Sequence, residues 1–168
     1  MRFRILGPLQ VEDVDGPVAL GGPKPRLLLA VLIVAAGEVV PADRLVAALW
    51  RDAVPPGAVA ALRAYVSRLR AVLAPAVALR HRPPGYCLTL DGATLDAAEF
   101  EQLVGAGRAA AAAGDHLRAL TDLDAALALW RGEALAEFAD DEFATATVAR
   151  LTELRTGALE DRALTLLE

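Results

Sequence analysis

The pattern of apolar residues changes near residues 92–94 and divides this chain of 168 residues into two unlike parts. Before this point, short segments with the two-residue period of strands are mixed with helical patterns; after it, every apolar pattern has a helical period. The sequence Gly92-Ala93-Thr94 fits neither pattern. We therefore expect two domains, residues 1–92 and residues 93–168, and a chain of this length can form two small ones.

The two parts carry opposite net charges. The whole chain has a net charge of −5, but residues 1–92 contain eleven basic and seven acidic side chains, which gives +4. Residues 93–168 contain six basic and fifteen acidic side chains, which gives −9. A basic part joined to an acidic part indicates two domains with different partners, and the basic part is the candidate for nucleic acid.

The first part predicts a small sheet, three helices and a hairpin. Phe3 and Ile5 alternate with arginines, and Asp15-Gly16 is a hairpin signal, so three short antiparallel strands are expected before residue 21. Helical patterns follow over residues 25–36, 42–50 and 58–74, and a hairpin is expected over residues 78–82 and 86–90. Three helices followed by a hairpin with arginines at its tip predict an α+β winged helix-turn-helix.

The helix over residues 58–74 is the most informative of the three. Its apolar residues recur every three or four positions and predict a buried stripe of Val59, Leu62, Val66, Leu69 and Leu73. Arg63, Ser67 and Arg70 line up beside this stripe, and Arg68 projects from the opposite flank. The face turned away from the core leaves room for a partner to approach the backbone, because it consists of Ala60, Ala64 and Ala71.

The second part predicts an all-α domain. Asp96 and Glu99 have the spacing of a capping box, and Asp115 is placed to cap the next helix. That helix carries an apolar stripe ending at Trp130, which we interpret as a core residue. The acidic run over residues 140–142 suits the positive N-terminal end of the long helix that follows.

No residue set in the sequence predicts catalysis, a metal site or a cofactor, so we do not expect an enzyme. His81 and His116 lack partners for nucleophilic or metal chemistry, and we interpret Cys87, the single cysteine, as a small residue that fills a strand. The most apolar run, residues 27–36, has about half of the ~20 residues needed to span a bilayer. No signal-peptide pattern opens the chain, so we expect a soluble, cytoplasmic protein.

A series of short segments runs through the whole chain in a definite order. In the first part they are Arg4-Ile-Leu-Gly-Pro-Leu, Leu20-Gly-Gly-Pro-Lys, Asp43-Arg-Leu-Val, Ala48-Leu-Trp, Tyr65-Val-Ser-Arg-Leu-Arg and Arg82-Pro-Pro-Gly-Tyr. In the second part they are Leu95-Asp, Glu99-Phe, Ala125 to Trp130-Arg-Gly, and Ala134-Leu. Taken together, these segments resemble the Streptomyces antibiotic regulatory protein family of transcriptional activators. The resemblance implies an OmpR-type winged helix over residues 1–92 and a helical, tetratricopeptide-like bacterial transcriptional activation domain over residues 93–168.

The resemblance also implies a function. Two copies, as a homodimer on DNA, would bind direct repeats in double-stranded promoter DNA, and the helical domain would contact RNA polymerase or its sigma factor. The regulated genes would belong to a secondary-metabolite cluster, such as one for antibiotic biosynthesis. The family's helical domain normally extends further, so we expect this one to be short at its C-terminal end.

The predicted recognition helix supplies the expected base contacts. Arg63, Ser67 and Arg70 are expected to face the major groove, where an arginine can donate to two guanine acceptors at once. Arg68 is expected to contact a phosphate or to pack back on its own domain. The alternative for all four residues is a solvated basic face on an ordinary helix.

Four further arginines are predicted to contact DNA from outside this helix. Arg44 and Arg51 are candidates for phosphate contacts. Arg82 matches the arginine of the family's wing, and with Arg80 it is expected at the narrow minor groove, where negative potential is concentrated. The alternative for these two is a surface hairpin without a ligand.

Two other functions remain open at the level of the sequence. The first is a shortened competitor that occupies the same DNA sites without recruiting polymerase and therefore represses. The second is a helical interaction module whose winged helix binds protein instead of DNA. Reporter transcription separates a competitor, which would lower it, from an activator. A salt titration on promoter DNA separates a protein-binding module from a DNA-binding protein.

Overall fold

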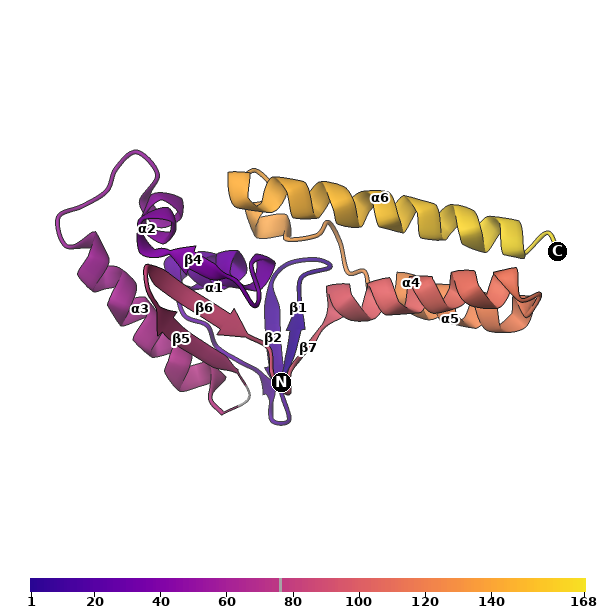
Figure 1. Cartoon of the computed structure of the whole chain (residues 1–168), viewed down its shortest axis with the longest axis horizontal. Coiled ribbons are helices and arrows are strands. Elements are labelled where there is room, and N and C mark those ends of the chain that lie inside the picture. The colour runs from indigo at the N-terminus through magenta and orange to yellow at the C-terminus, as the bar shows by residue number, and fades with distance from the viewer. Residues whose placement is uncertain (76) are drawn as a thin grey trace. The chain divides into compact units, whose positions relative to one another are not determined.

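The computed structural model describes residues 1–75 and 77–168 (Figure 1). These residues divide into two compact units. Unit 1 consists of Met1–Arg2 and Gln10–Ala93, and unit 2 consists of Phe3–Leu9 and Thr94–Glu168. The chain is of the α+β class, as expected, with mixed strands and helices before residue 94 and mainly helices after it. No helix in the described part of the chain is long and apolar enough to cross a membrane.

The three helices expected in the first part are present in unit 1. They are α1 (Pro23–Val34), α2 (Ala42–Trp50) and α3 (Ala58–Leu73), and they begin and end close to the predicted residues. α1 has prolines in its first turn. The backbone N–H groups of a first turn have no acceptor within the helix, so a proline, which lacks this group, costs no hydrogen bond there. Most of its following side chains are buried, which explains why its sequence is apolar nearly all round.

Three short strands precede α1, as expected. They are β1 (Arg2–Arg4), β2 (Gln10–Asp13) and β3 (Gly16–Pro17). β2 and β3 pair antiparallel in unit 1, with Glu12 opposite Pro17 and Asp13 opposite Gly16. Gly16 has a φ of 118°, a conformation that favours glycine, and this explains the strength of the Asp15-Gly16 turn signal.

A second sheet in unit 1 contains the expected hairpin and one strand that was not expected. β5 (Ala78–Arg82) and β6 (Gly85–Thr89) form the hairpin, and β4 (Val39–Pro41) pairs with the other edge of β6. The sequence of β4 is too short to show a two-residue period. A Cβ atom on Gly85 would lie 1.9 Å from the carbonyl oxygen of Val40, so only glycine allows β4 and β6 to approach at this position.

The buried stripe of α3 differs from the predicted one at its first residue. The structure buries Ala58, Leu62, Val66, Leu69 and Leu73, whereas Val59 is 50% exposed. The prediction for Val59 is therefore wrong. A stripe that starts at residue 58 and one that starts at residue 59 both fit a helical period. The prediction chose valine at 59 over alanine at 58 because valine has the larger apolar side chain. The remaining four stripe residues are buried as predicted.

Unit 2 is built mainly from three helices, α4 (Asp96–Ala112), α5 (His116–Ala128) and α6 (Glu142–Thr165), with a short 3₁₀ helix η1 (Ala136–Phe138) before the last. Asp115 caps α5 as predicted, because its carboxylate accepts the N–H of Arg118 at 3.1 Å. α4 and α5 pack closely at Gly107, where an added Cβ would lie 2.8 Å from Cγ of Leu123. The strand β7 (Thr94–Leu95) leads into α4 and is hydrogen-bonded to β1.

Asp96 does not form the predicted capping box. Leu95 is the N-cap of α4, and the fully buried carboxylate of Asp96 instead accepts the backbone N–H of Ile5 at 2.7 Å and that of Leu6 at 3.1 Å. The guanidinium of Arg131 lies 3.8 Å away. Burial raises the pKa of the Asp96 carboxyl, while the two N–H groups and Arg131 act in the opposite direction. The spacing of Asp96 and Glu99 could not reveal a partner 90 residues earlier in the chain.

These bonds explain why residues 3–9 belong to unit 2. The backbone N–H of Arg131 donates to the carbonyl of Leu6 at 2.8 Å, and that of Leu135 donates to the carbonyl of Ile5 at 2.9 Å. The N–H of Leu9 donates to the carboxylate of Glu137 at 2.9 Å. The division expected from the sequence, residues 1–92 and 93–168, differs from the two units at this segment, because long-range hydrogen bonds do not appear in a local apolar pattern.

Replacing Asp96 by asparagine should destabilise unit 2. The N–H groups of Ile5 and Leu6 reach different oxygens of the carboxylate, so the amide oxygen of asparagine can replace only one of these acceptors and the amide NH₂ then faces the other donor. An unsatisfied buried donor costs about 1–3 kcal/mol in the free energy of unfolding, which urea denaturation measures. Glu101→Gln is the matched control, since Glu101 forms an exposed ion pair with Arg150 that is worth at most about 1 kcal/mol. Equal losses in the two variants would show that Asp96 does not hold residues 3–9.

Candidate nucleic-acid interface

The outward face of α3 presents the polar residues that the sequence singled out. Arg63, Ser67, Arg68 and Arg70 are all exposed, on the side of the helix away from its buried stripe. Three alanines lie between Arg68 and the other polar residues, on the face of α3 opposite the buried stripe. All three are exposed: Ala60, Ala64 and Ala71. The predicted arrangement of a small-residue face between basic flanks is therefore present.

Arg70 differs from the other arginines of α3. Its Nε donates a hydrogen bond to the backbone carbonyl of Leu79 at 2.6 Å, which connects α3 to β5. The sequence did not indicate this bond, since donor and acceptor lie on either side of the connection between a helix and a strand. Arg70 therefore holds the hairpin against the helix with one part of its guanidinium. Arg70 as a whole nevertheless remains exposed.

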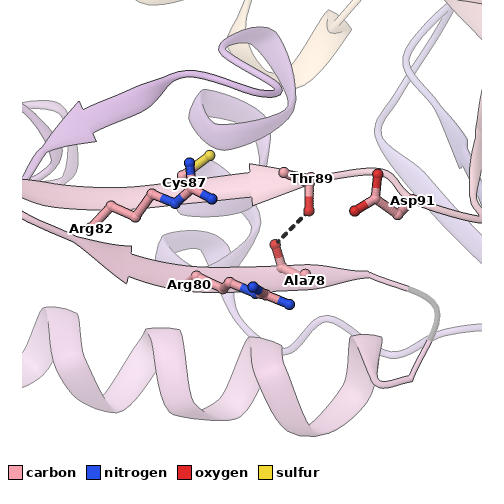
Figure 2. Close-up of a pocket in the computed structure, with 6 residues that line it drawn as sticks. All are labelled: Ala78, Arg80, Arg82, Cys87, Thr89 and Asp91. Carbon is pink, nitrogen blue, oxygen red and sulfur yellow. Dashed lines mark hydrogen bonds between the residues drawn. The ribbon is translucent and has the colours of Figure 1, made fainter.

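Arg80 and Arg82 lie two residues apart on β5, so their side chains project from the same face of the strand. They line a small pocket of about 90 Å³ together with Ala78, Cys87, Thr89 and Asp91 (Figure 2). Both arginines are exposed, and Cys87 is buried beside them. The neighbouring His81 packs edge-on against Tyr86, with ring centroids 5.3 Å apart, so it has a structural contact on the hairpin.

The two other arginines that the sequence predicted to contact DNA lie at the ends of α2. Arg44 lies in the first turn of α2 and is exposed. Arg51 is the C-cap residue of the same helix and has a φ of 48°, which is unusual for a residue other than glycine. They therefore occupy opposite ends of this helix.

The arginines of the two units differ in how their charge is balanced. In the described part of the chain, no acidic side chain forms an ion pair with Arg63, Arg68, Arg80 or Arg82. Every arginine after residue 93 has a partner instead: Arg108 with Asp161, Arg118 with Asp122, Arg131 with Asp96, Arg150 with Glu101, Arg162 with Asp124, and Arg155 over the ring of Trp130. Unit 1 thus exposes unbalanced positive charge, and the acidic excess of unit 2 is not offset by free cations.

The described residues contain no group of three or more histidine, cysteine, aspartate or glutamate side chains that could hold a metal ion. Besides the hydrogen bond from Arg70 to Leu79, sequence reasoning missed two further arrangements. One is the hydrogen bonding of Asp96 to residues 5 and 6. The other connects Lys24 to the end of α2. Each joins segments more than 20 residues apart, and no local pattern reports such a contact.

Two protein families match the two parts of the chain. Residues 17–88 match the family described as the C-terminal domain of transcriptional regulatory proteins. Residues 95–168 match the bacterial transcriptional activator domain. The order of these matches defines a transcription regulator that consists of a DNA-binding type of domain followed by an activator type of domain.

Regulators from Mycobacterium and from Streptomyces are similar to this chain. The chain is 41% identical over 156 residues to the transcriptional regulatory protein EmbR of Mycobacterium tuberculosis, covering 90% of this chain and 40% of that protein. It is 39% identical over 163 residues to the regulatory protein AfsR of Streptomyces coelicolor, covering 96% of this chain and 16% of that protein. It is 33% identical to the regulatory protein DnrI of Streptomyces peucetius, covering 96% of this chain and 63% of that protein. The chain belongs to the Streptomyces antibiotic regulatory protein family.

A solved structure supports the same relationship. The structure of Mycobacterium tuberculosis EmbR in complex with a low affinity phosphopeptide matches with a TM-score of 0.89 at 36% sequence identity. The match covers 99% of this chain and 45% of that chain. The chain therefore spans less than half of the length of EmbR.

The hydrogen bond from Arg70 should make this arginine more important for stability than Arg63. Arg70→Met removes the donor to the Leu79 carbonyl and should lower the free energy of unfolding by about 1 kcal/mol or more. Arg63→Met removes an exposed charge from the same helix without such a bond, and its effect should stay within about 0.5 kcal/mol. Urea unfolding of both variants measures the difference. A loss in Arg63→Met as large as that in Arg70→Met would refute the structural role of Arg70.

Proposed function

We propose that this chain is a sequence-specific DNA-binding transcriptional activator in which unit 1 acts as a winged helix-turn-helix with α3 as its recognition helix. The observation that supports it most is the set of exposed arginines on α3 and β5 that lack acidic partners in the described residues. Unbalanced positive charge on one domain favours binding to a phosphate backbone. The match of residues 17–88 to the regulator family supports the same conclusion.

α3 has the shape that reading of the major groove requires. The groove admits an α-helix, and the exposed alanines allow the backbone of α3 to come close to the base edges. Arg63 and Ser67 then face the bases from one flank. Arg70 reaches the same side with its Nη groups while its Nε holds β5. Arg68, on the other flank, contacts a phosphate and sets the position of the helix.

The remaining arginines support binding from outside the recognition helix. Arg82 and Arg80 enter or border the minor groove from the hairpin, where negative potential is concentrated. Arg44 and Arg51 contact phosphates from the two ends of α2. Contacts from a helix and a hairpin to adjacent grooves would place each copy in one orientation on the duplex. This orientation suits two copies bound as a homodimer to direct repeats.

Unit 2 is proposed to act on the transcription machinery. Residues 95–168 match the bacterial transcriptional activator domain, and the arginines of this part of the chain are already engaged. An acidic, tetratricopeptide-like helical unit suits a protein partner and disfavours DNA. We propose RNA polymerase or its sigma factor as that partner. The resemblance to regulators of antibiotic production supports a secondary-metabolite cluster as the set of regulated genes.

Alanine variants of Arg63 and Arg68 should separate base reading from phosphate binding. Arg63→Ala should cost about 1–3 kcal/mol on the preferred sequence and relax the preference at one base position. Arg68→Ala should weaken binding to all sequences alike and reduce the dependence of log K on log salt by about one. Selection of duplexes from a randomised pool, followed by salt titration, measures both effects.

Two results would contradict this assignment. If Arg68→Ala changes the base preference and Arg63→Ala does not, the DNA-facing side of α3 is the opposite one. If the full chain binds no duplex even at low salt, unit 1 is not a DNA-binding domain and the proposed function fails. The two results are distinct, because only the second removes binding by the unaltered chain.

A further inference from the structure

The chain has 17 lysine and arginine residues, and Lys24 is the only lysine. It lies in the first turn of α1, and its ammonium donates a hydrogen bond to the backbone carbonyl of Leu49 at 2.6 Å. The same ammonium lies 4.9 Å from the centre of the Trp50 ring. Leu49 and Trp50 are the last two residues of α2. One side chain of α1 therefore contacts the C-terminal end of α2 in two ways.

Both contacts have a physical reason. The last carbonyls of a helix have no intrahelical donor, and the C-terminal end of a helix carries partial negative charge. α2 has no basic residue in its own last turn, and Lys24 of α1 places a cation at the carbonyl of Leu49 there. An ammonium is a compact charge with three donors, which allows it to bind a carbonyl and face an aromatic ring at the same time.

The contact continues into α3. The ring of Trp50 stacks on that of Tyr65, with ring centroids 6.3 Å apart and an angle of 23° between the rings. Tyr65 is a half-buried residue of α3 that lies between Arg63 and Ser67 in the sequence. The three side chains, which we call the Lys24–Trp50–Tyr65 cluster, connect the start of α1, the end of α2 and the middle of α3.

The connection between α2 and α3 makes this cluster important. Residues 51–57 are exposed throughout, so the connection itself adds little buried contact to fix the direction in which α3 leaves α2. Two of these residues have positive φ values, Arg51 at 48° and Gly57 at 87°. The stack of Trp50 on Tyr65 crosses this connection and joins its two helices directly.

We propose that Lys24 is a positioning residue for DNA recognition: it fixes the indole of Trp50 against Tyr65 and thereby the orientation of α3, without contacting DNA itself. This inference rests on the proposed function, in which α3 reads the bases. Loss of the ammonium would let α3 change its angle against α2. Base contacts depend on that angle, whereas non-specific attraction to phosphates depends mainly on charge.

The test compares Lys24→Met with Arg44→Met in the full chain. Affinity is measured at several salt concentrations for a duplex selected by the unaltered chain from a randomised pool, and for a scrambled duplex of the same composition. Lys24→Met should lower the ratio of the two affinities about tenfold, comparable to one lost base contact, and leave the salt dependence unchanged. Arg44→Met should weaken both duplexes equally and reduce the salt dependence by about one.

A second pair of variants covers the case in which Lys24→Met does not fold. Tyr65→Leu removes the ring that Trp50 stacks on and should lower the affinity ratio as Lys24→Met does, whereas Tyr65→Phe keeps the ring and should retain the ratio. Emission from Trp50 in a Trp130→Phe background should change on Lys24→Met without DNA present, because the ammonium no longer faces the ring.

Three results would overturn the positioning role. The first is a Lys24→Met variant that behaves like Arg44→Met, which would make Lys24 a phosphate contact. The second is an unchanged affinity ratio in Lys24→Met or Tyr65→Leu. The third is a Trp50 emission that does not respond to loss of Lys24. Absence of any selected duplex for the unaltered chain would instead contradict the proposed function, and the positioning role would fall with it.

Discussion

The buried carboxylate of Asp96 is the interaction on which the organisation of unit 2 depends. A buried charge is costly unless it is paired and hydrogen-bonded, and Asp96 obtains its partners from the N–H groups of Ile5 and Leu6 and from Arg131. The carbonyls of the same two residues accept from Arg131 and Leu135, so residues 5 and 6 satisfy their backbone groups within unit 2. The chain consequently passes between the two units three times, at residues 2–3, 9–10 and 93–94.

The balance of charge is the second constraint, and it links the fold to the function. In unit 2, arginines of α4 and α6 pair with acids on neighbouring helices, as Arg108 does with Asp161 and Arg150 with Glu101. These pairs use the positive charge of unit 2 for contacts among its helices. In unit 1, by contrast, the core is held by apolar side chains, and the exposed residues Arg63, Arg68, Arg80 and Arg82 form no ion pair with an acidic side chain of the described residues. This unbalanced charge is the basis on which we propose that unit 1 binds an anionic partner.

The sequence predicted the elements of this fold better than the contacts between them. Apolar periods indicated α1, α2 and α3, and the Asp15-Gly16 turn indicated the first hairpin, because each depends on neighbours in the chain. β4 was missed because three residues show no period, and the role of Asp96 was missed because its partners lie at the other end of the chain. The exposure of Arg63, Ser67 and Arg68 followed from the helical period, but the bond from Arg70 to Leu79 requires the packing of α3 on β5.

We propose that the two units serve different partners, DNA for unit 1 and RNA polymerase for unit 2. Transcription in vitro from a template that carries the selected duplex upstream of a promoter separates the two roles, when occupancy of the DNA and transcript yield are measured in the same reaction. If unit 2 recruits polymerase, transcript yield should rise in parallel with occupancy by the chain. A yield that stays constant or falls at full occupancy would contradict an activating role and identify the chain as a competitor for its DNA site.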